Sequence, residues 1–309
     1  VIGADRVVDG DELYGEGFSE DVERGDTYGP LSYVTYVPFE QALPWSGRWD
    51  DLPAAHGAAI SFDLLVVAGL LLLGGRLRPG REGRLLGLAL AYAWTAYPYT
   101  AFALETNSND SLVALACVGA MLALTASPAR SGLAAAGRGI AVGFGAAAKF
   151  APLALAPLFA IYPSRARSRP AVFGLALLAV LALTVLPFLP DGGFRELYDR
   201  TVGYQVARPS PFSVWGQTSL DWAHTAAKAL VVALAVGLAL VPRERSPRQM
   251  AALGAVVLIA VQLVATHWFY LYVVWFVPFV FVACLGAYRL PVENTRPATP
   301  PREREVVLA

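Results

Sequence analysis

Apolar and polar positions alternate along the chain in long blocks. Eight apolar stretches of 17 or more residues are separated by polar connections, and they cover 57–75, 85–105, 111–127, 139–162, 171–190, 223–241, 250–266 and 268–288. A helix needs roughly 20 apolar residues to cross a hydrocarbon layer about 30 Å thick. The pattern therefore predicts an all-α polytopic membrane protein with a transmembrane domain at 57–290. The polar segments 1–56 and 191–222 are predicted to form short helices or turns along the membrane surface.

Arginine marks four of the connections between these stretches. The residues are Arg76, Arg78, Arg81 and Arg84; Arg130 and Arg138; Arg165, Arg167 and Arg169; and Arg243, Arg245 and Arg248. Because cytoplasmic loops are enriched in Lys and Arg, all four connections are predicted to be cytoplasmic. Segment 1–56 holds half of the chain's acids, and both it and 191–222 are predicted to be extracytoplasmic. The tail 291–309 is then predicted to be cytoplasmic and disordered.

One apolar stretch conflicts with this arrangement. Segment 139–162 has an arginine-bearing connection on each side, so a single crossing would place one of them outside. A broken hairpin with Lys149 near its turn, and with Pro152 and Pro157 in the returning arm, resolves the conflict. Gly and Pro residues around the turn support a break in the helix. The sequence predicts about seven crossings and one re-entrant hairpin; the alternative is a plain helix whose lysine snorkels.

Composition narrows the functional classes. Hydrophobic residues make up 56% of the chain and charged residues 16%, which is typical of a membrane protein. Equal numbers of basic and acidic residues, 24 each, give no indication of nucleic-acid binding. The sequence holds no Walker A loop and no Cys/His metal spacing, so a nucleotide-driven pump is not supported. The first residues contain no signal peptide, and a further transmembrane helix is expected before Val1.

Polar residues gather at the predicted extracytoplasmic ends of the spans. Asn109 and Asp110 precede one apolar stretch, His267 precedes another, and Lys149 points to the same side if the hairpin is correct. Intramembrane charges are costly and mark candidate sites. Asp110 or Asn109 has an alternative role as a helix N-cap, and His267 has one in an interfacial aromatic belt. Asp63, within the first span, is assigned to structure rather than to catalysis.

These residue types suit a reaction on an anionic, lipid-linked substrate. A carboxylate would deprotonate an acceptor hydroxyl, while Lys149 and Arg208 would hold the departing phosphate. The acids of segment 1–56, Asp26 among them, are candidates for the base or for a divalent cation, although a solvated acidic loop is the simpler interpretation. No metal site is assigned. Tyr28 and other aromatic residues of the two outer segments could face sugars or lipid headgroups.

Five features carry a resemblance to a known family. They are residues 4–10 with Tyr14; the Tyr- and Pro-rich stretch 28–38; the Gly-rich helix ending in Lys149 with Pro152; the region of Gln205, Arg208 and Trp215; and His267 before a span with Trp275 and Pro278. Together they resemble the GT-C superfamily of membrane glycosyltransferases, and most closely its bacterial polyprenyl-phosphate-mannose-dependent α-mannosyltransferase branch.

The resemblance implies transfer of a sugar, in that branch mannose, from a polyprenyl-phosphate donor to an extracytoplasmic lipid or glycan acceptor. It also implies a catalytic acid in the first outer loop, just after a transmembrane helix. Asp26 and Asp5 are the nearest candidates in this chain. The substrate-binding candidates are Lys149, Arg208, Gln205, His267, Asn109, Asp110 and Tyr28. The rival from another class is a transporter or lipid flippase with a broken-helix substrate site, for which internal repeats would be expected and none is visible.

Overall fold

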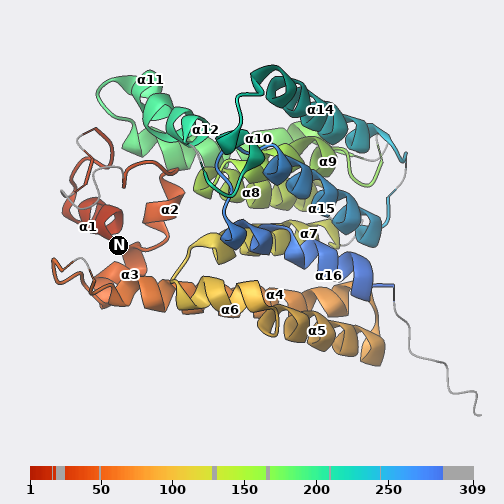
Figure 1. Ribbon diagram of the computed structural model, residues 1–309. Helices are drawn as coiled ribbons and strands as arrows, with labels where there is room; N and C mark the ends of the chain where they lie inside the picture. Colours follow the sequence, from red (N-terminus) through yellow and green to blue (C-terminus); the bar gives the residue numbers. More distant parts are fainter. Residues whose placement is uncertain are drawn as a thin grey trace, which may run out of the picture.

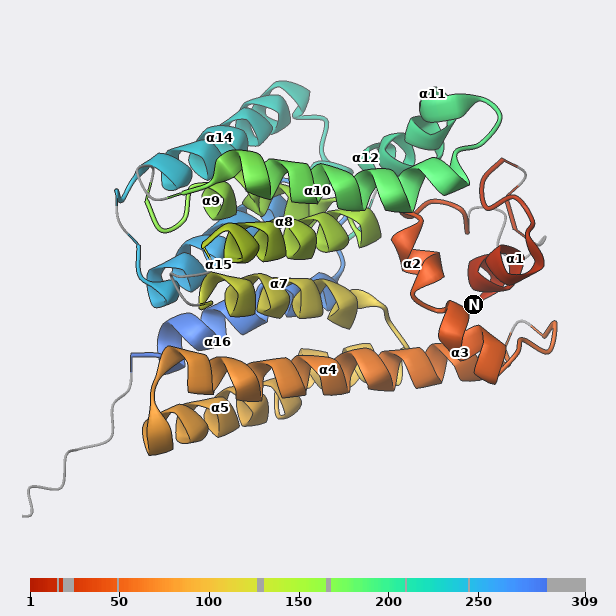
Figure 2. The ribbon, with the colours of Figure 1, turned by 180° about the vertical axis from the view of Figure 1, so that it is seen from behind.

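The protein is a bundle of helices in which no described residue lies in a β-strand (Figures 1 and 2). The computed structural model describes residues 1–15, 17–18, 25–48, 50–126, 131–164, 168–208, 210–243 and 245–287. The predicted tail 291–309 lies outside these residues. The bundle core is apolar and centres on fully buried side chains such as Leu70, Trp94, Phe159 and Phe279.

Three described helices are long and apolar enough, by length and composition, to cross a membrane: Pro53–Leu77 (α4), Pro170–Phe188 (α10 with η4) and Asp221–Leu240 (α14). Shorter apolar helices lie beside them, at Asp110–Leu124 (α7), Ala151–Ala160 (η3 and α9) and Pro247–Leu263 (α15). Only 11% of the apolar window of α10 and of α14 is buried inside the protein, as expected for helices that face lipid. The polytopic helical architecture predicted from the sequence is confirmed.

Two predicted spans are broken helices rather than continuous ones. The stretch predicted at 85–105 forms α5 (Gly80–Thr95) and α6 (Pro98–Glu105), because Pro98 lacks the N–H that would continue the first helix. The stretch predicted at 268–288 forms a 3-10 helix, η6 (Tyr270–Trp275), followed by α16 (Val277–Leu285). Pro278 lies at the start of α16. The lengths of the apolar runs predicted helical stretches in these places but did not predict the breaks inside them.

The predicted hairpin is present, and its first arm begins earlier than the sequence pattern indicated. Helix α8 (Ser131–Ala148) runs to the turn at Lys149, and η3 (Ala151–Leu155) and α9 (Ala156–Ala160) return beside it. Arg138 in the first arm donates hydrogen bonds to the carbonyl oxygens of Phe159 and Tyr162 at 3.0 and 3.3 Å. Arg138, in the first arm, therefore lies beside the end of the returning arm.

Glycine in α8 serves helix packing and not the break. A Cβ on Gly139 would lie 2.3 Å from the carbonyl oxygen of Phe173, and one on Gly143 would lie 3.1 Å from that of Leu177. Both contacts are with α10 (Pro170–Val185), so this small-xxx-small spacing lets the two backbones approach closely. The helix stays continuous through these glycines and ends at Ala148.

Arginine side chains bind carbonyl oxygens at one end of the bundle, which we call the arginine end. Arg78 donates to Gly286 at 2.7 Å and Arg248 to Ala283 at 2.9 Å, both at the end of α16. Arg245 donates to Leu238 at 3.2 Å, near the end of α14. Cations at helix C-termini interact favourably with the carbonyls left unpaired there. The shared position of the arginine loops thus has a structural cause as well as a topological one.

The opposite end, which we call the loop end, carries the two long polar segments. The first contains α1 (Ile2–Asp9), α2 (Leu31–Val34) and α3 (Val37–Ala42), and α4 follows at Pro53, four residues before the predicted span. The second contains α11 (Gly193–Tyr198), a π-helix η5 (Asp199–Gly203), α12 (Tyr204–Ala207) and α13 (Val214–Gln217). These short helices surround the same end of the bundle in both views (Figures 1 and 2).

Candidate functional site

Lys149 forms the centre of the polar cluster at the loop end. It follows α8 directly, and its backbone N–H donates the last helical hydrogen bond, to Gly145 at 2.8 Å. Its ammonium lies 2.8 Å from the Asp110 carboxylate, and the two side chains are 9% and 4% exposed. Neighbouring Ala147 and Ala148 are also buried. The hairpin turn therefore holds a paired cation inside the protein.

Asp110 is held by three donors. Besides Lys149, the indole Nε1 of Trp275 donates to its Oδ1 at 2.6 Å, and the Ser108 hydroxyl donates to its other oxygen. Asn109 occupies the N-cap position of α7 but makes no side-chain capping hydrogen bond. The N-cap interpretation thus fails for Asn109. Asp110, in the first turn of α7, ties three separate segments together.

Aromatic rings enclose the Lys149 ammonium. Its Nζ lies 5.2 Å from the ring centroid of Tyr28, 5.5 Å from Tyr272 and 5.6 Å from Trp275. Tyr272 and Trp275 stack on each other with centroids 4.3 Å apart. The negative faces of aromatic rings attract a cation within about 6 Å. This arrangement places the rings of η6 inside the bundle, so Tyr272 belongs to the site and not to an exposed interfacial belt.

Tyr28 is positioned by hydrogen bonds with two buried tyrosines. The Tyr14 hydroxyl donates to the Tyr28 carbonyl at 2.7 Å, and the Tyr28 N–H donates to the Tyr33 hydroxyl, which donates to Gly25 at 2.7 Å. Burial raises the pKa of Tyr14 and of Tyr33 well above the usual tyrosine value, so both hydroxyls remain protonated donors. The loop that carries Tyr28 is thereby fixed from two sides.

Gly29 and Ser32 dock this loop onto the end of α8. The Ser32 hydroxyl donates to the Ala148 carbonyl at 2.7 Å. A Cβ on Gly29 would lie 2.0 Å from the Ala147 carbonyl oxygen, so only glycine permits this approach. Both contacts are adjacent to Lys149. The N-terminal polar segment is therefore built into the site rather than lying loosely above it.

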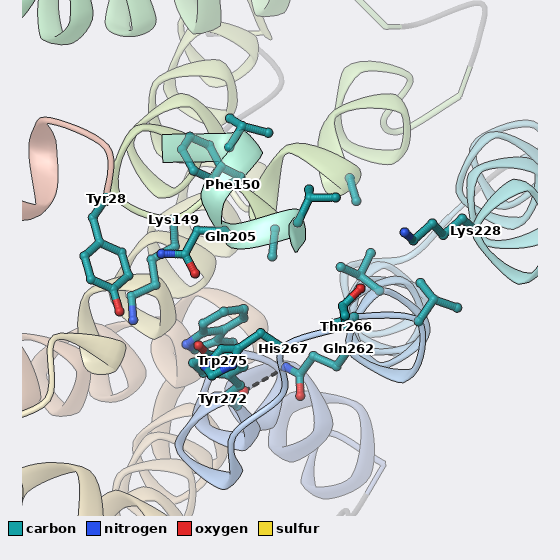
Figure 3. A pocket seen from close by; sticks show the side chains of 17 residues that line it. Tyr28, Lys149, Phe150, Gln205, Lys228, Gln262, Thr266, His267, Tyr272 and Trp275 are labelled. Carbon is teal, nitrogen blue, oxygen red and sulfur yellow. Dashed lines mark hydrogen bonds between the residues drawn. The ribbon is translucent and has the colours of Figure 1, made fainter. Parts of the chain in front are cut away.

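Two cavities meet at Lys149. The first, which we call the lysine cavity, has a volume of about 340 Å³ and is lined by Lys149, Gln205 and Trp275 among mostly apolar side chains (Figure 3). The second, the loop cavity, has a volume of about 610 Å³ and lies among the loop-end segments. Tyr28, Lys149, His267 and Tyr272 line both cavities. A ligand that reaches Lys149 from either side would contact the same four side chains.

The structure brings all seven predicted substrate-binding residues to these cavities. Asn109, Asp110 and Arg208 line the loop cavity, and Gln205 lines the lysine cavity. The Arg208 guanidinium lies 5.9 Å from the Tyr204 ring, and the Gln205 amide donates to Thr27. Tyr28, Lys149 and His267 line both cavities, so each of the seven candidates lines at least one cavity.

The two predicted catalytic acids do not line either cavity. Asp26 is 2% exposed and pairs with Arg200 of η5 at 2.9 Å. Asp5 lies in α1, where partial burial and the neighbouring Asp9 carboxylate raise its pKa. Asp110 is the acid that the cavities contain among the described residues, and its oxygens already accept from three donors.

Other polar residues outside the cluster serve packing. Asp63 accepts a hydrogen bond from the Trp94 indole at 2.8 Å, which joins α4 to α5 as the structural interpretation predicts. His224 stacks on Trp215, with ring centroids 4.7 Å apart. Within the described ranges, no group of three or more His, Cys, Asp or Glu residues could hold a metal ion. The divalent cation considered from the sequence stays a prediction.

Sequence reasoning missed three contributors. Ser108 and Trp275 bond Asp110, and Trp275 is 165 residues away in the chain. Lys228 of α14 lines the lysine cavity and was hidden within an apolar run. A simple signal was present for Lys228, since Lys149 and Lys228 are the two lysines of the chain.

The bundle and its buried site define a polytopic all-helical membrane protein. Its fold is similar to that of ArnT from Cupriavidus metallidurans, whose crystal structure was determined bound to undecaprenyl phosphate, with a TM-score of 0.61 and 16% sequence identity. The match covers 92% of this chain and 53% of ArnT, so the chain spans about half the length of that protein. At this level of identity the likeness shows that the two proteins share a polytopic helical membrane fold. No protein-family model matches the chain, and no curated protein is significantly similar to it.

Proposed function

We propose that the protein is a membrane glycosyltransferase that moves a sugar from a polyprenyl-phosphate donor to a lipid or glycan acceptor. The observation that carries this proposal is the buried Lys149, enclosed by aromatic rings where two cavities meet. ArnT, which shares the fold, was crystallised with undecaprenyl phosphate. A lipid phosphate needs a cation and an apolar cavity, and the lysine cavity offers both.

The chemistry follows from the charge that develops during transfer. When the bond between the sugar and the phosphate breaks, negative charge grows on the leaving lipid phosphate. A preorganised cation in a water-poor site stabilises this charge far more than one in water. Lys149 would provide that cation, and Arg208 in the loop cavity would provide a second. Asp110 keeps Lys149 charged and in place, because their ion pair is buried.

The acceptor hydroxyl needs a base. The resemblance calls for an acid in the first outer loop, and Asp26 and Asp5 are the candidates for it in this chain. Because neither acid lines a cavity, neither is assigned as the base in the state described by the structure. Asp26 reaches this role only if its pair with Arg200 opens. The loop cavity would hold the donor sugar and the acceptor, because the polar side chains of Asn109, Asp110 and Arg208 line it. Mannose is the proposed sugar and rests on the resemblance alone.

Orientation is the remaining part of the proposal. The arginine end would face the cytoplasm by the positive-inside rule, which makes the loop end and its cavities extracytoplasmic. The chain's termini then lie on opposite sides, with the N-terminal loop outside. This orientation suits a donor that is presented on the outer leaflet by its lipid.

A transporter or flippase is the second candidate, and one observation favours it. The helix breaks at Lys149, whose side chain is the buried cation. Secondary transporters have discontinuous helices of this kind at their substrate sites. Such a protein would move the lipid without cleaving the bond between sugar and phosphate. Release of the sugar from the donor therefore separates the two candidates.

The test uses the full-length protein in nanodiscs with radiolabelled polyprenyl-phosphate mannose and membrane lipid acceptors. We expect labelled glycan on the acceptor with wild type and at least a hundredfold less with Lys149→Ala. Lys149→Arg keeps the charge but not the shape, so partial activity is expected. Asp63→Asn, which changes a buried carboxylate outside both cavities, serves as the matched control. Absence of transfer from polyprenyl-phosphate mannose, glucose and arabinose donors alike would reject the enzyme proposal.

A further inference from the structure

Both lysines of the chain line the same cavity. The remaining basic side chains are arginines, which bind carbonyl oxygens or pair with acids in many places. Lys149, directly after α8, and Lys228, in α14, are 79 positions apart, yet each contributes to the lysine cavity. Lys149 is explained by its ion pair and its rings. Lys228 has no such explanation within the bundle.

Lys228 lies in an apolar, outward-facing helix. It is seven residues from the start of α14 at Asp221, roughly 10 Å along the helix at 1.5 Å per residue. Only 11% of the apolar window of α14 is buried, and Lys228 itself is exposed. In the part of the chain that the structure describes, it forms no hydrogen bond or ion pair. A charge at this depth in a lipid-facing helix is costly and marks a functional candidate.

The position of Lys228 also shows where the cavity reaches the surface. Because this side chain is exposed and lines the cavity, the lysine cavity opens beside α14. Figure 3 shows Lys149 and Lys228 on opposite sides of the cavity, with Gln262, Thr266 and His267 between them. The cavity is therefore a passage with a cation at each end, one paired and deep and one unpaired at the mouth.

We propose that Lys228 is the entry cation of the lysine cavity, which binds the phosphate of a polyprenyl-phosphate lipid at the lateral mouth before the phosphate reaches Lys149. This inference rests on the proposed function, because it assigns a route to the same lipid. An anionic headgroup that crosses an apolar mouth loses hydration, and a cation at that point offsets part of the cost. Lysine suits the task, since its ammonium is a point charge on a flexible stem.

An entry cation has a kinetic signature that differs from that of a residue in the final site. If Lys228 contacts the phosphate only during passage, its removal slows binding and release equally, and the dissociation constant stays the same. A residue that holds the phosphate in the final complex instead changes the dissociation constant, mainly through faster release. Lys149 is expected to behave in this second way.

The experiment measures association and dissociation rates of decaprenyl phosphate with the full protein in nanodiscs. We expect Lys228→Gln to lower both rates about tenfold, with a change below twofold in the dissociation constant, and Lys228→Arg to restore them. Inorganic phosphate and uncharged decaprenol are the comparison ligands. Lys228→Gln should leave the rates for decaprenol unchanged, because that lipid carries no charge, and inorganic phosphate should bind at most weakly.

A charge-relocation variant provides the matched control. Leu230 lies about 200° further around the helix from Lys228, at nearly the same depth, and is 70% exposed. The double variant Lys228→Gln/Leu230→Lys keeps a snorkelling cation on α14 but moves it off the cavity. We expect it to bind as slowly as Lys228→Gln alone.

The outcomes distinguish the entry role of Lys228 from the proposed function of the protein. Unchanged rates in Lys228→Gln, or full recovery in the relocation variant, would show a snorkelling lysine and overturn the inference. A larger dissociation constant in Lys228→Gln would place Lys228 in the final complex and overturn the entry role. Failure of wild type to bind decaprenyl phosphate would reject the proposed function itself. Weaker binding of decaprenyl phosphate by Lys149→Ala, combined with unchanged rates in Lys228→Gln, would be consistent with the proposed function and would reject only the entry role of Lys228.

Discussion

The Lys149 ammonium and the Asp110 carboxylate lie 2.8 Å apart at a helix break, each side chain more than nine-tenths buried. Lys149 directly follows α8, Asp110 is the first residue of α7, and these two helices pack against each other. Removing one member of a buried pair leaves an uncompensated charge, whereas removing both leaves none. The free energy of unfolding should therefore depend on whether both charges of the pair are present.

The first prediction concerns this coupling. Asp110→Asn should lower the free energy of unfolding by about 3 to 5 kcal/mol, because Lys149 stays buried without a counter-ion. The double variant Asp110→Asn/Lys149→Met should recover most of that loss, so with Lys149→Met as the third variant the effects of the two single changes should not add. Denaturant titration in mixed micelles measures both. Asp63→Asn is the control, since Trp94 can still donate to the new amide oxygen. Additive losses would contradict the coupling.

The architecture was largely predictable because the bilayer imposes it. Apolar runs predicted where helices lie, and arginine-bearing connections predicted that 139–162 returns to the end from which it starts. The position of the turn at Lys149 also followed from the proline after it. Breaks inside two other spans did not follow, since no charged residue lies near Pro98 or Pro278 to mark them within their apolar runs.

The site was predictable in part, for a different reason. Polar residues inside apolar runs are conspicuous, so Lys149, Asp110 and His267 could be selected one by one. Their mutual contacts depend on tertiary packing, and nothing local links Trp275 to Asp110 across 165 positions. The pairing of Asp26 with Arg200 across 174 positions was equally hidden. Sequence patterns thus indicated which residues matter more reliably than which residues meet.

A second prediction tests the glycine contact between α8 and α10. Gly139→Ala would place a Cβ 2.3 Å from the Phe173 carbonyl oxygen, and the backbone there cannot move aside cheaply. We expect a loss of about 1 to 3 kcal/mol in the free energy of unfolding. Gly174→Ala, in α10 with no atom within 4 Å of the added Cβ, should be neutral or more stable by up to about 1 kcal/mol. Equal effects of the two changes would refute the packing role.

A third prediction tests orientation. In a background of Cys117→Ala and Cys284→Ala, single cysteines are placed at Asp191, on the loop end, and at Arg81, on the arginine end. A membrane-impermeant maleimide should label Asp191→Cys in intact cells, because the loop end is predicted to be extracytoplasmic. Arg81→Cys should react only after permeabilisation. The reverse pattern would invert the proposed topology and move the cavities to the cytoplasmic side.

The last prediction separates two roles for Asp26. As a general base, Asp26 would contribute about 10²- to 10⁴-fold to the rate. Replacing Asp26 would then lower the activity far more than replacing Arg200. As a structural partner it fixes the loop that carries Tyr28, and breaking the pair from either side should have similar effects. The Gln205 amide secures the same loop through Thr27, so the loop should survive the change.

We expect the structural outcome, because Asp26 is buried and lines neither cavity. Asp26→Asn and Arg200→Met should each lower kcat/KM for sugar transfer less than about tenfold and to a similar extent. Hydrogen exchange should rise in residues 25–30 and 199–207 in both variants and stay unchanged in α4 and α5. A fall of a thousandfold or more in kcat for Asp26→Asn, with Arg200→Met nearly unaffected, would instead assign Asp26 as the base. The pair with Arg200 would then have to open during each catalytic cycle.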